Sequence, residues 1–178
     1  MSFVAITAVG QDRPGIVAEV TGVLYRQGCN LEDSTMTRLH DQFAMLLVVD
    51  VPEDAYLALD TALQLVASRL GLSLVIRPLG PKLAAVEETG ETYMLRVYGA
   101  DRPGIVHAVT AELAQRGWNI TDLNTRLLAG GNGPAYVLML EVVAPGPAAA
   151  AELEPELARL RETLGVEISL EQLDAEAL

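Results

Sequence analysis

The spacing of hydrophobic and polar residues changes in a regular order along the chain and predicts a set of short strands and helices. Stretches with alternating or continuous apolar residues indicate strands, and apolar residues three and four positions apart indicate helices. Glycine and proline fall between these stretches, where turns are expected. In the first half the predicted strands are Phe3–Val9, Asn30–Leu39, Phe43–Val51 and Leu72–Ile76, and the predicted helices are Pro14–Gln27 and Asp54–Leu70.

The same order of elements returns in the second half. Each half has the order strand, helix, strand, strand, helix, strand, which is the split βαβ or ferredoxin-like plan. We therefore predict an α+β protein of two tandem ferredoxin-like βαββαβ domains, each a four-stranded antiparallel sheet with two helices on one face. In this plan the second strand of each half lies at a sheet edge, where unpaired backbone groups can bind another strand. In the second half the predicted strands are Thr92–Tyr98, Asn119–Leu128, Tyr136–Val143 and Val166–Leu170, and the predicted helices are Pro103–Arg116 and Ala148–Leu164.

A repeated six-residue motif supports this duplication. The sequence Asp-Arg-Pro-Gly-Ile-Val occupies Asp12–Val17 and recurs at Asp101–Val106, 89 positions later. A match of the chain to itself at one fixed offset indicates a duplicated unit. We predict domains over residues 1–80 and 92–174 with a linker over 81–91. Domains of this size bury only about 60–65% of their unfolded surface, so we expect the copies to pack against each other or against another chain.

Residues with strong positional preferences set the expected ends of these elements. Asp12 is expected to cap the first helix, because its carboxylate can accept from free N–H groups, and Pro14 is expected in the first turn. Gly28 is expected to end that helix as a C′ glycine. The stretch from Pro78 to Lys82 is expected to break both helix and strand.

Composition and charge narrow the classes of function. The chain is 51% hydrophobic and 20% charged, as in ordinary globular proteins. Its 24 acidic and 12 basic residues give a net charge of −12, which disfavours direct binding to nucleic acid. The single cysteine, Cys29, allows no intrachain disulfide, and no apolar stretch is long enough to span a membrane. We therefore expect a cytoplasmic protein that binds neither nucleic acid nor membrane.

The motif and its surroundings resemble the ACT domain. In each copy the motif lies at the first strand-to-helix turn, and Gly-x-Asn follows at the end of the helix, at Gly28–Asn30 and Gly117–Asn119. Two tandem copies with little else are similar to the glycine cleavage system transcriptional repressor group. The first copy, with Gly28-Cys29-Asn30-Leu31, also resembles the regulatory front end of formyltetrahydrofolate deformylase.

This resemblance implies a regulatory module that senses an amino acid. It implies that the ligand lies where the first turn of one ACT domain meets the second strand of a neighbour. For the repressor group it also implies regulation through contact with a DNA-binding activator protein, with which the acidic net charge agrees.

The repeated turn is a candidate binding site for a small zwitterion. A helix N-terminus offers free N–H groups and a partial positive charge, and Gly15 and Gly104 would let a carboxylate approach the backbone. The aspartates could accept from an ammonium group, the arginines could clamp a carboxylate, and the asparagines could donate and accept. The candidate ligand-binding residues are Asp12, Arg13, Pro14, Gly15, Ile16, Asn30 and Leu31 in the first copy and Asp101, Arg102, Pro103, Gly104, Ile105, Asn119 and Ile120 in the second.

The same residue types also have purely structural interpretations. The aspartates would then be helix caps, the prolines helix starters, the glycines turn formers and the asparagines partners of the helix end, with the arginines in solvent. The two copies also differ near the turn. The second has Trp118 where the first has Cys29, and His107 where the first has Ala18. If both copies bind, they need not bind the same ligand.

The sequence offers no pattern typical of catalysis. It contains nothing that resembles a catalytic triad, a paired-carboxylate site or a nucleotide fingerprint, and its two histidines have no cysteine or second histidine at ligand spacing. We predict no catalytic residues, no metal and no cofactor.

The predicted function is therefore regulatory and non-catalytic. We expect a homo-oligomer that senses a small amino acid, with glycine as the first candidate, and that changes its contact with a protein partner such as a transcription regulator. A ligand-free assembly module and a detached regulatory subunit of an amino-acid or one-carbon enzyme are the alternatives. An enzyme in its own right comes last.

Overall fold

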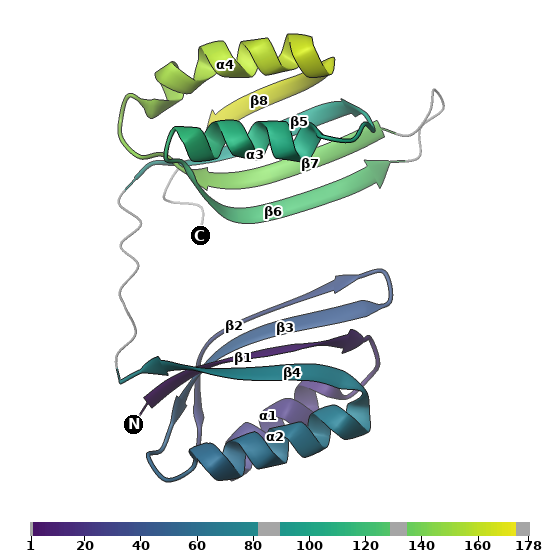
Figure 1. The fold of residues 1–178 in the computed structure, drawn as a ribbon, viewed down its shortest axis with the longest axis vertical. Coiled ribbons are helices and arrows are strands. Elements are labelled where there is room, and N and C mark those ends of the chain that lie inside the picture. The colour runs from purple at the N-terminus through teal and green to yellow at the C-terminus, as the bar shows by residue number, and fades with distance from the viewer. Residues whose placement is uncertain (1, 82–89, 129–134, 174–178) are drawn as a thin grey trace. The chain divides into compact units, whose positions relative to one another are not determined.

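A computed structural model describes residues 2–81, 90–128 and 135–173, and the chain divides into two units, 1–85 and 86–178 (Figure 1). Each unit has the element order βαββαβ, which confirms the predicted α+β plan. We keep 1–80 and 92–174 as the proposed domain limits. The first unit comprises β1 (Ser2–Gln11), α1 (Ile16–Arg26), β2 (Asn30–Leu39), β3 (Gln42–Val51), α2 (Tyr56–Leu70) and β4 (Leu72–Gly80). The second comprises β5 (Thr92–Ala100), α3 (Ile105–Gln115), β6 (Asn119–Leu128), β7 (Ala135–Val143), α4 (Ala149–Leu164) and β8 (Val166–Gln172).

Both sheets are antiparallel and share one strand order. The first runs β2-β3-β1-β4 and the second β6-β7-β5-β8. Figure 1 shows α1 and α2 together on one face of the first sheet, and α3 and α4 together on one face of the second. The second strand of each unit, β2 or β6, lies at a sheet edge as predicted, because the following strand pairs with the first strand of its unit.

The core of each unit lies between the sheet and its two helices. Along β3 every second side chain is buried, from Phe43 to Val51, and these residues meet the apolar stripes of α1 and α2. In the second unit β5 and β7 supply the inward side chains, and Leu153 and Leu157 of α4 are fully buried among them. Burying one such side chain contributes about 1.5–3 kcal/mol, so the alternation in the strands and the stripe in the helices together hold each unit.

Several strands, β4 most of all, extend further than their hydrophobic patterns predict, whereas β2 and β6 have the predicted bounds. The prediction that Pro78 and Gly80 break the strand is wrong, because Pro78 pairs with Val4 and Gly80 with Phe3 at the far end of β4. This strand lies at a sheet edge, where a residue without an N–H group can face solvent and leave the ladder intact.

The start of the first helix also differs from its prediction. The N-cap of α1 is Gly15, and no side chain caps it. Asp12 is therefore not the cap: its N–H donates to the Asp41 carbonyl at 2.7 Å, and its carboxylate accepts from Arg38 at 3.4 Å. Pro14 precedes the helix, which begins at Ile16. Gly28 lies just past the helix with a φ of 67°, and its N–H donates to a carbonyl of the last turn, as predicted.

Two further predictions concern the linker and the membrane. Residues 82–89 of the predicted linker, 81–91, lie outside the described part of the chain. Within the described residues, none of the helices is long and apolar enough to cross a membrane.

Candidate functional site

The repeated turn has the same open backbone in both units. Gly15 and Gly104 adopt φ values of 96° and 98°, in the left-handed region that favours glycine. A Cβ placed on either glycine would meet no heavy atom within 4 Å. In α1, Glu19 is the first residue whose N–H donates back to the turn, at Gly15, so the N–H groups before it have no partner in the helix. The turn therefore presents unshielded backbone to an approaching anion or dipole.

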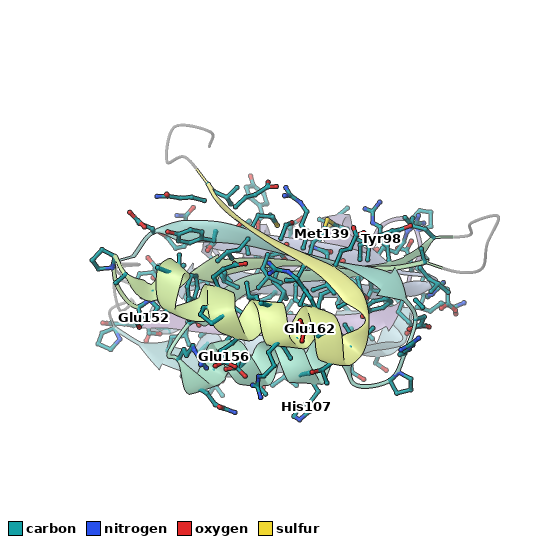
Figure 2. All side chains as sticks on the ribbon, turned by 90° about the horizontal axis from the view of Figure 1, so that it is seen from above. Tyr98, His107, Met139, Glu152, Glu156 and Glu162 are labelled. Atoms are coloured by element: carbon teal, nitrogen blue, oxygen red, sulfur yellow. The ribbon has the colours of Figure 1, made fainter. Side chains whose placement is uncertain are left out.

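In the second unit this turn lines a hollow of about 470 Å³. Five predicted residues border it, Asp101 through Ile105, so the structure brings this half of the candidate site together. Val106 and His107 continue the wall along α3, and Tyr136 enters it from β7. Figure 2 shows His107 projecting outward from α3.

Sequence analysis missed Tyr136 as a residue of this hollow. Tyr136 lies opposite Gly99 in the ladder between β5 and β7, and Gly99 has no side chain to cover the ring. Phe43 holds the equivalent ladder position in the first unit, opposite Gly10, and is buried. Only the strand register reveals this relation, because more residues separate β6 from β7 than separate β2 from β3.

The two repeated arginines lie near the ends of helices. A Cβ placed on Gly71, the C-cap of α2, would lie 3.4 Å from Nη2 of Arg13. A Cβ placed on Gly165, the C-cap of α4, would lie 3.7 Å from Nη1 of Arg102. A helix C-terminus carries a partial negative charge, which attracts a guanidinium group. This gives the arginines a structural role and also leaves them beside the turn that a ligand carboxylate would approach.

The hollows of the first unit lie in different places from the hollow at the second turn. A hollow of about 150 Å³ lies between α1 and β2 and includes only Leu31 of the predicted residues. Its wall is mainly apolar, with Val17, Met36 and Leu47 among its members. The Asp12 carboxylate forms an ion pair with the Arg38 guanidinium, as described above.

The predicted asparagines lie far from the turn of their own unit. Asn30 starts β2 at the C-terminal end of α1, an 11-residue helix about 16 Å long at about 1.5 Å per residue. Arg38, which contacts Asp12, lies eight residues further along β2, about 26 Å away at ~3.3 Å per residue. One small ligand therefore cannot touch the turn and the asparagine of the same unit.

The start of β2 carries polar groups that the start of β6 lacks. Asn30 donates from Nδ2 to Oε1 of Glu32 at 2.7 Å, and the ladder with β3 shifts register between Leu31 and Asp33. Asn30 lies opposite Asp50, whose Oδ1 atom is buried and has no hydrogen-bond partner among the described residues. Asn119 in β6 instead lies opposite Val143.

The residues before the two asparagines are both packed into the structure. Burial raises the pKa of the Cys29 thiol, and the negative charge of Asp50 raises this pKa further, which lowers the fraction of reactive thiolate. Its counterpart Trp118 is buried and meets Tyr93 edge to face, with ring centroids 5.4 Å apart.

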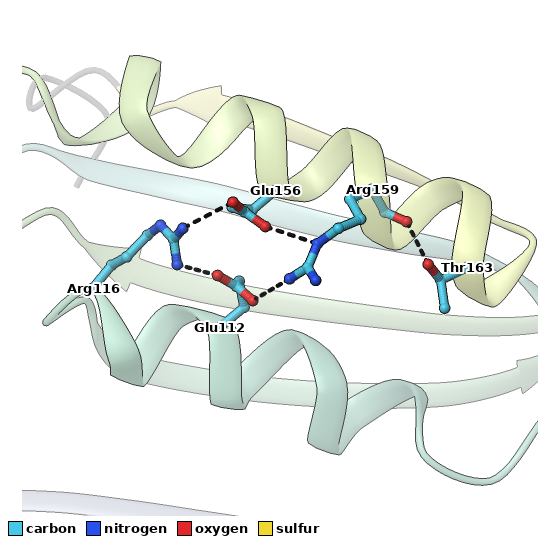
Figure 3. A network of polar contacts seen from close by, with 5 residues as sticks. All are labelled: Glu112, Arg116, Glu156, Arg159 and Thr163. Atoms are coloured by element: carbon cyan, nitrogen blue, oxygen red, sulfur yellow. Dashed lines mark hydrogen bonds and ion pairs between the residues drawn. The ribbon is translucent and has the colours of Figure 1, made fainter.

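The second unit also contains an ion-pair network between α3 and α4, centred on the buried Glu112 (Figure 3). Glu112 pairs with Arg116, the C-cap residue of α3, and with Arg159 on α4 at 3.2 Å, and Glu156 of α4 pairs with both arginines. Glu112 is only 7% exposed and stands where the first unit has Val23. Sequence analysis missed the network, although a glutamate at an apolar position of the repeat is a visible signal.

Comparison with known proteins gives the same division of the chain. The family model of the ACT domain matches residues 2–77 and again residues 91–171. The glycine cleavage system transcriptional repressor of Escherichia coli K12 is 31% identical over 153 residues, which cover 83% of this chain and 77% of the relative. The UPF0237 protein MMP0657 of Methanococcus maripaludis is 38% identical over 79 residues, which cover 43% of this chain and 88% of that relative.

A solved structure extends this similarity to the whole chain. The crystal structure of an unknown protein from Galdieria sulphuraria superposes with a TM-score of 0.81 at 32% identity, covering 97% of this chain and 99% of that one.

Proposed function

The chain belongs to the ACT-domain family, and from that premise we propose that it is a regulatory protein that senses a small amino acid and alters its contact with a partner protein. The observation that carries the proposal is the hollow beside the second copy of the repeated turn. It combines free helix N–H groups, the Arg102 guanidinium and the Asp101 carboxylate. These groups complement the carboxylate and the ammonium group of a zwitterion.

The ligand site is proposed to use two copies of the module. The turn and the asparagine of one unit are too far apart for one small ligand, as the lengths of α1 and β2 show. Each residue of β2 is exposed along its edge of the sheet, which leaves a ten-residue backbone edge for another strand. We therefore include assembly into a homo-oligomer in the proposal.

The proposed partner follows from the named relative. The Escherichia coli relative is a transcriptional repressor of the glycine cleavage system, so glycine is the first ligand to test and a transcription regulator of that system the first partner. The net charge of −12 favours action through a protein over action on DNA. The proposed role is cytoplasmic and non-catalytic, with ligand occupancy as the signal.

Calorimetric titration of the whole chain tests this proposal. The protein is unfolded and refolded to remove bound metabolites and is then titrated with glycine, serine and the other amino acids. We expect saturable heat with one of them and a dissociation constant in the micromolar to millimolar range, about −8 to −4 kcal/mol. Heat that does not saturate with any amino acid would contradict the proposal and favour an assembly module without a ligand.

A further inference from the structure

The first sheet has one face that its own helices do not cover. Figure 1 shows α1 and α2 together on the same side of the sheet, and the side chains that point away from them form its outer face. The strand register assigns every second residue to this face, because the alternate residues are buried beneath the helices. Two neighbouring rows of the outer face contain no ionisable side chain. From β4 to β2, one row is Ser73, Val9, Ala44 and Thr37, and the next is Val75, Thr7, Leu46 and Thr35.

These rows expose apolar side chains where the solvent side of an antiparallel sheet is normally polar. Val9, Leu46 and Val75 are 42%, 44% and 63% exposed. The row that follows has charges only at its two ends. From β4 to β2 it is Arg77, Ala5, Val48 and Asp33. The outer face of the first sheet is therefore apolar, with a positive charge at one edge and a negative charge at the other.

The second unit shows that the fold does not require an apolar outer face. In the equivalent rows Arg96 takes the place of Thr7, and Glu141 takes the place of Val48. The ionisable side chains on the outer face of the second sheet are Arg96, Asp122, Arg126, Glu141, Glu167 and Glu171. Such a charged face suits contact with water, so the apolar face is a property of the first unit alone.

The size and charge of the outer face of the first sheet suit a second copy of the same face. Its strands have nine or ten residues, and four such strands span about 33 Å by about 19 Å, a face of about 600 Å². Two faces in contact bury about 1,200 Å², which exceeds the roughly 1,000 Å² of a specific interface. The chain has a net charge of −12, so two copies repel each other least where they meet over uncharged surface.

A twofold axis parallel to the strands also pairs the charges at the edges. This axis places β4 of each copy over β2 of the other within the same row, so that Arg77 lies over Asp33. It keeps the strands of the two sheets nearly aligned, as in common sheet packing. Among the described residues neither Arg77 nor Asp33 forms an ion pair within its own unit. A hollow of about 70 Å³ beside Asp33, Leu46 and Val48 offers space for the incoming guanidinium.

We propose that the outer face of the first sheet is an interface between two copies of this chain, which pack sheet on sheet with Arg77 of each copy paired to Asp33 of the other. Removal of the exposed apolar side chains from water drives the association. The inference goes beyond the proposed function, because this contact needs no ligand and uses a sheet face in place of the β2 edge.

Analytical ultracentrifugation of the whole chain tests the contact. Val75→Lys should sediment with half as many copies as the wild type at micromolar concentration, because it places an unpaired ammonium group inside an apolar interface. Val75 lies on β4, at the opposite edge of the sheet from β2, so pairing along β2 is left intact. A lysine also lowers the net negative charge, so general repulsion between copies cannot explain dissociation. Ser169→Lys, at the equivalent exposed position of β8, is the matched control and should leave the number of copies unchanged.

An exchange of charges tests the orientation. Arg77→Glu and Asp33→Arg should each raise the dissociation constant of the assembly at least tenfold, because like charges then meet across the interface. The double variant restores opposite charges and should recover most of the wild-type affinity between copies.

Three results would each overturn the inference and assign the face to another occupant. They are a wild-type protein that sediments as a single chain, an unchanged number of copies in Val75→Lys, and a double charge variant that does not recover. None of them bears on the calorimetric titration with amino acids, so amino-acid sensing is tested separately.

Discussion

One glycine in each copy, Gly15 or Gly104, determines the backbone conformation of the repeated turn and how open it is. Both hold a left-handed backbone, and both face open space on the side where a Cβ would stand. A side chain at either position would therefore suffer from backbone strain and not from a clash. It would also cover the backbone that the proposed ligand would approach, so its effect on binding should exceed its effect on folding.

Substitution of Gly104 by valine separates these two effects. We expect Gly104→Val to destabilise the second unit by about 1–3 kcal/mol, the usual cost of a strained backbone, while the unit still folds. Amino-acid binding at the hollow should fall below detection in calorimetric titration. Gly146→Val is the matched control, because a Cβ on Gly146 also meets no atom within 4 Å and its φ is not in the left-handed region. Retained affinity in Gly104→Val would exclude the turn from the ligand site.

The pair of helices in the second unit is held differently from the pair in the first. In the second unit Glu112 lies between α3 and α4, paired with Arg116 at the C-cap of α3 and with Arg159 of α4. Val23 fills the same place in the first unit and belongs to its apolar core. A buried carboxylate is stabilised only while its partners remain. Loss of an arginine partner should therefore destabilise the second unit more than replacement of Glu112 by an apolar residue does.

Two variants of this network test that asymmetry. Glu112→Val should change the free energy of unfolding by no more than about 1 kcal/mol, because the released arginines can reach water and an apolar side chain replaces a desolvated charge. Arg116→Ala leaves the carboxylate buried with one partner and should cost more, about 1–3 kcal/mol. Urea denaturation measures both. A larger loss in Glu112→Val than in Arg116→Ala would contradict the assignment of the network as a dispensable substitute for apolar packing.

The identity and order of the elements could be predicted from the sequence because each has its own period, but only some of their ends could be. Pro78 belongs to β4 because Val4 lies beside it in the sheet. The residues next to Pro78 in the sequence do not indicate this pairing. The same limit applies to the candidate site. The turn from Asp101 to Ile105 is continuous in sequence and was predicted, whereas Tyr136 and Asp50 depend on strand register and were not.

On the scale of the whole molecule, the chain is two similar units with different chemistry at equivalent places. The second unit has the hollow at the turn, and the first has the unpaired Asp50 carboxylate near the end of its third strand, opposite the start of β2. In each unit the second strand, β2 or β6, forms one exposed edge of the sheet. The open edge is available for the proposed assembly between copies.

Lysines placed on the β2 edge test the proposed assembly. We expect wild-type protein to sediment as a dimer or larger species at micromolar concentration, and a Thr35→Lys, Thr37→Lys double variant to sediment as a smaller one, because lysines on an edge oppose strand pairing. Both threonines are exposed. Thr61→Lys, at an exposed position on α2, should leave the sedimentation coefficient unchanged. An unaltered assembly in the double variant would place the interface elsewhere.

The packing of Trp118 against Tyr93 makes the protein its own optical probe. Trp118 is the single tryptophan of the chain and is buried in the second unit, one residue before Asn119. Fluorescence excited at the red edge of protein absorption therefore originates from that unit alone, whereas circular dichroism reports the helices of both. The difference between the two signals isolates the behaviour of the first unit without a label.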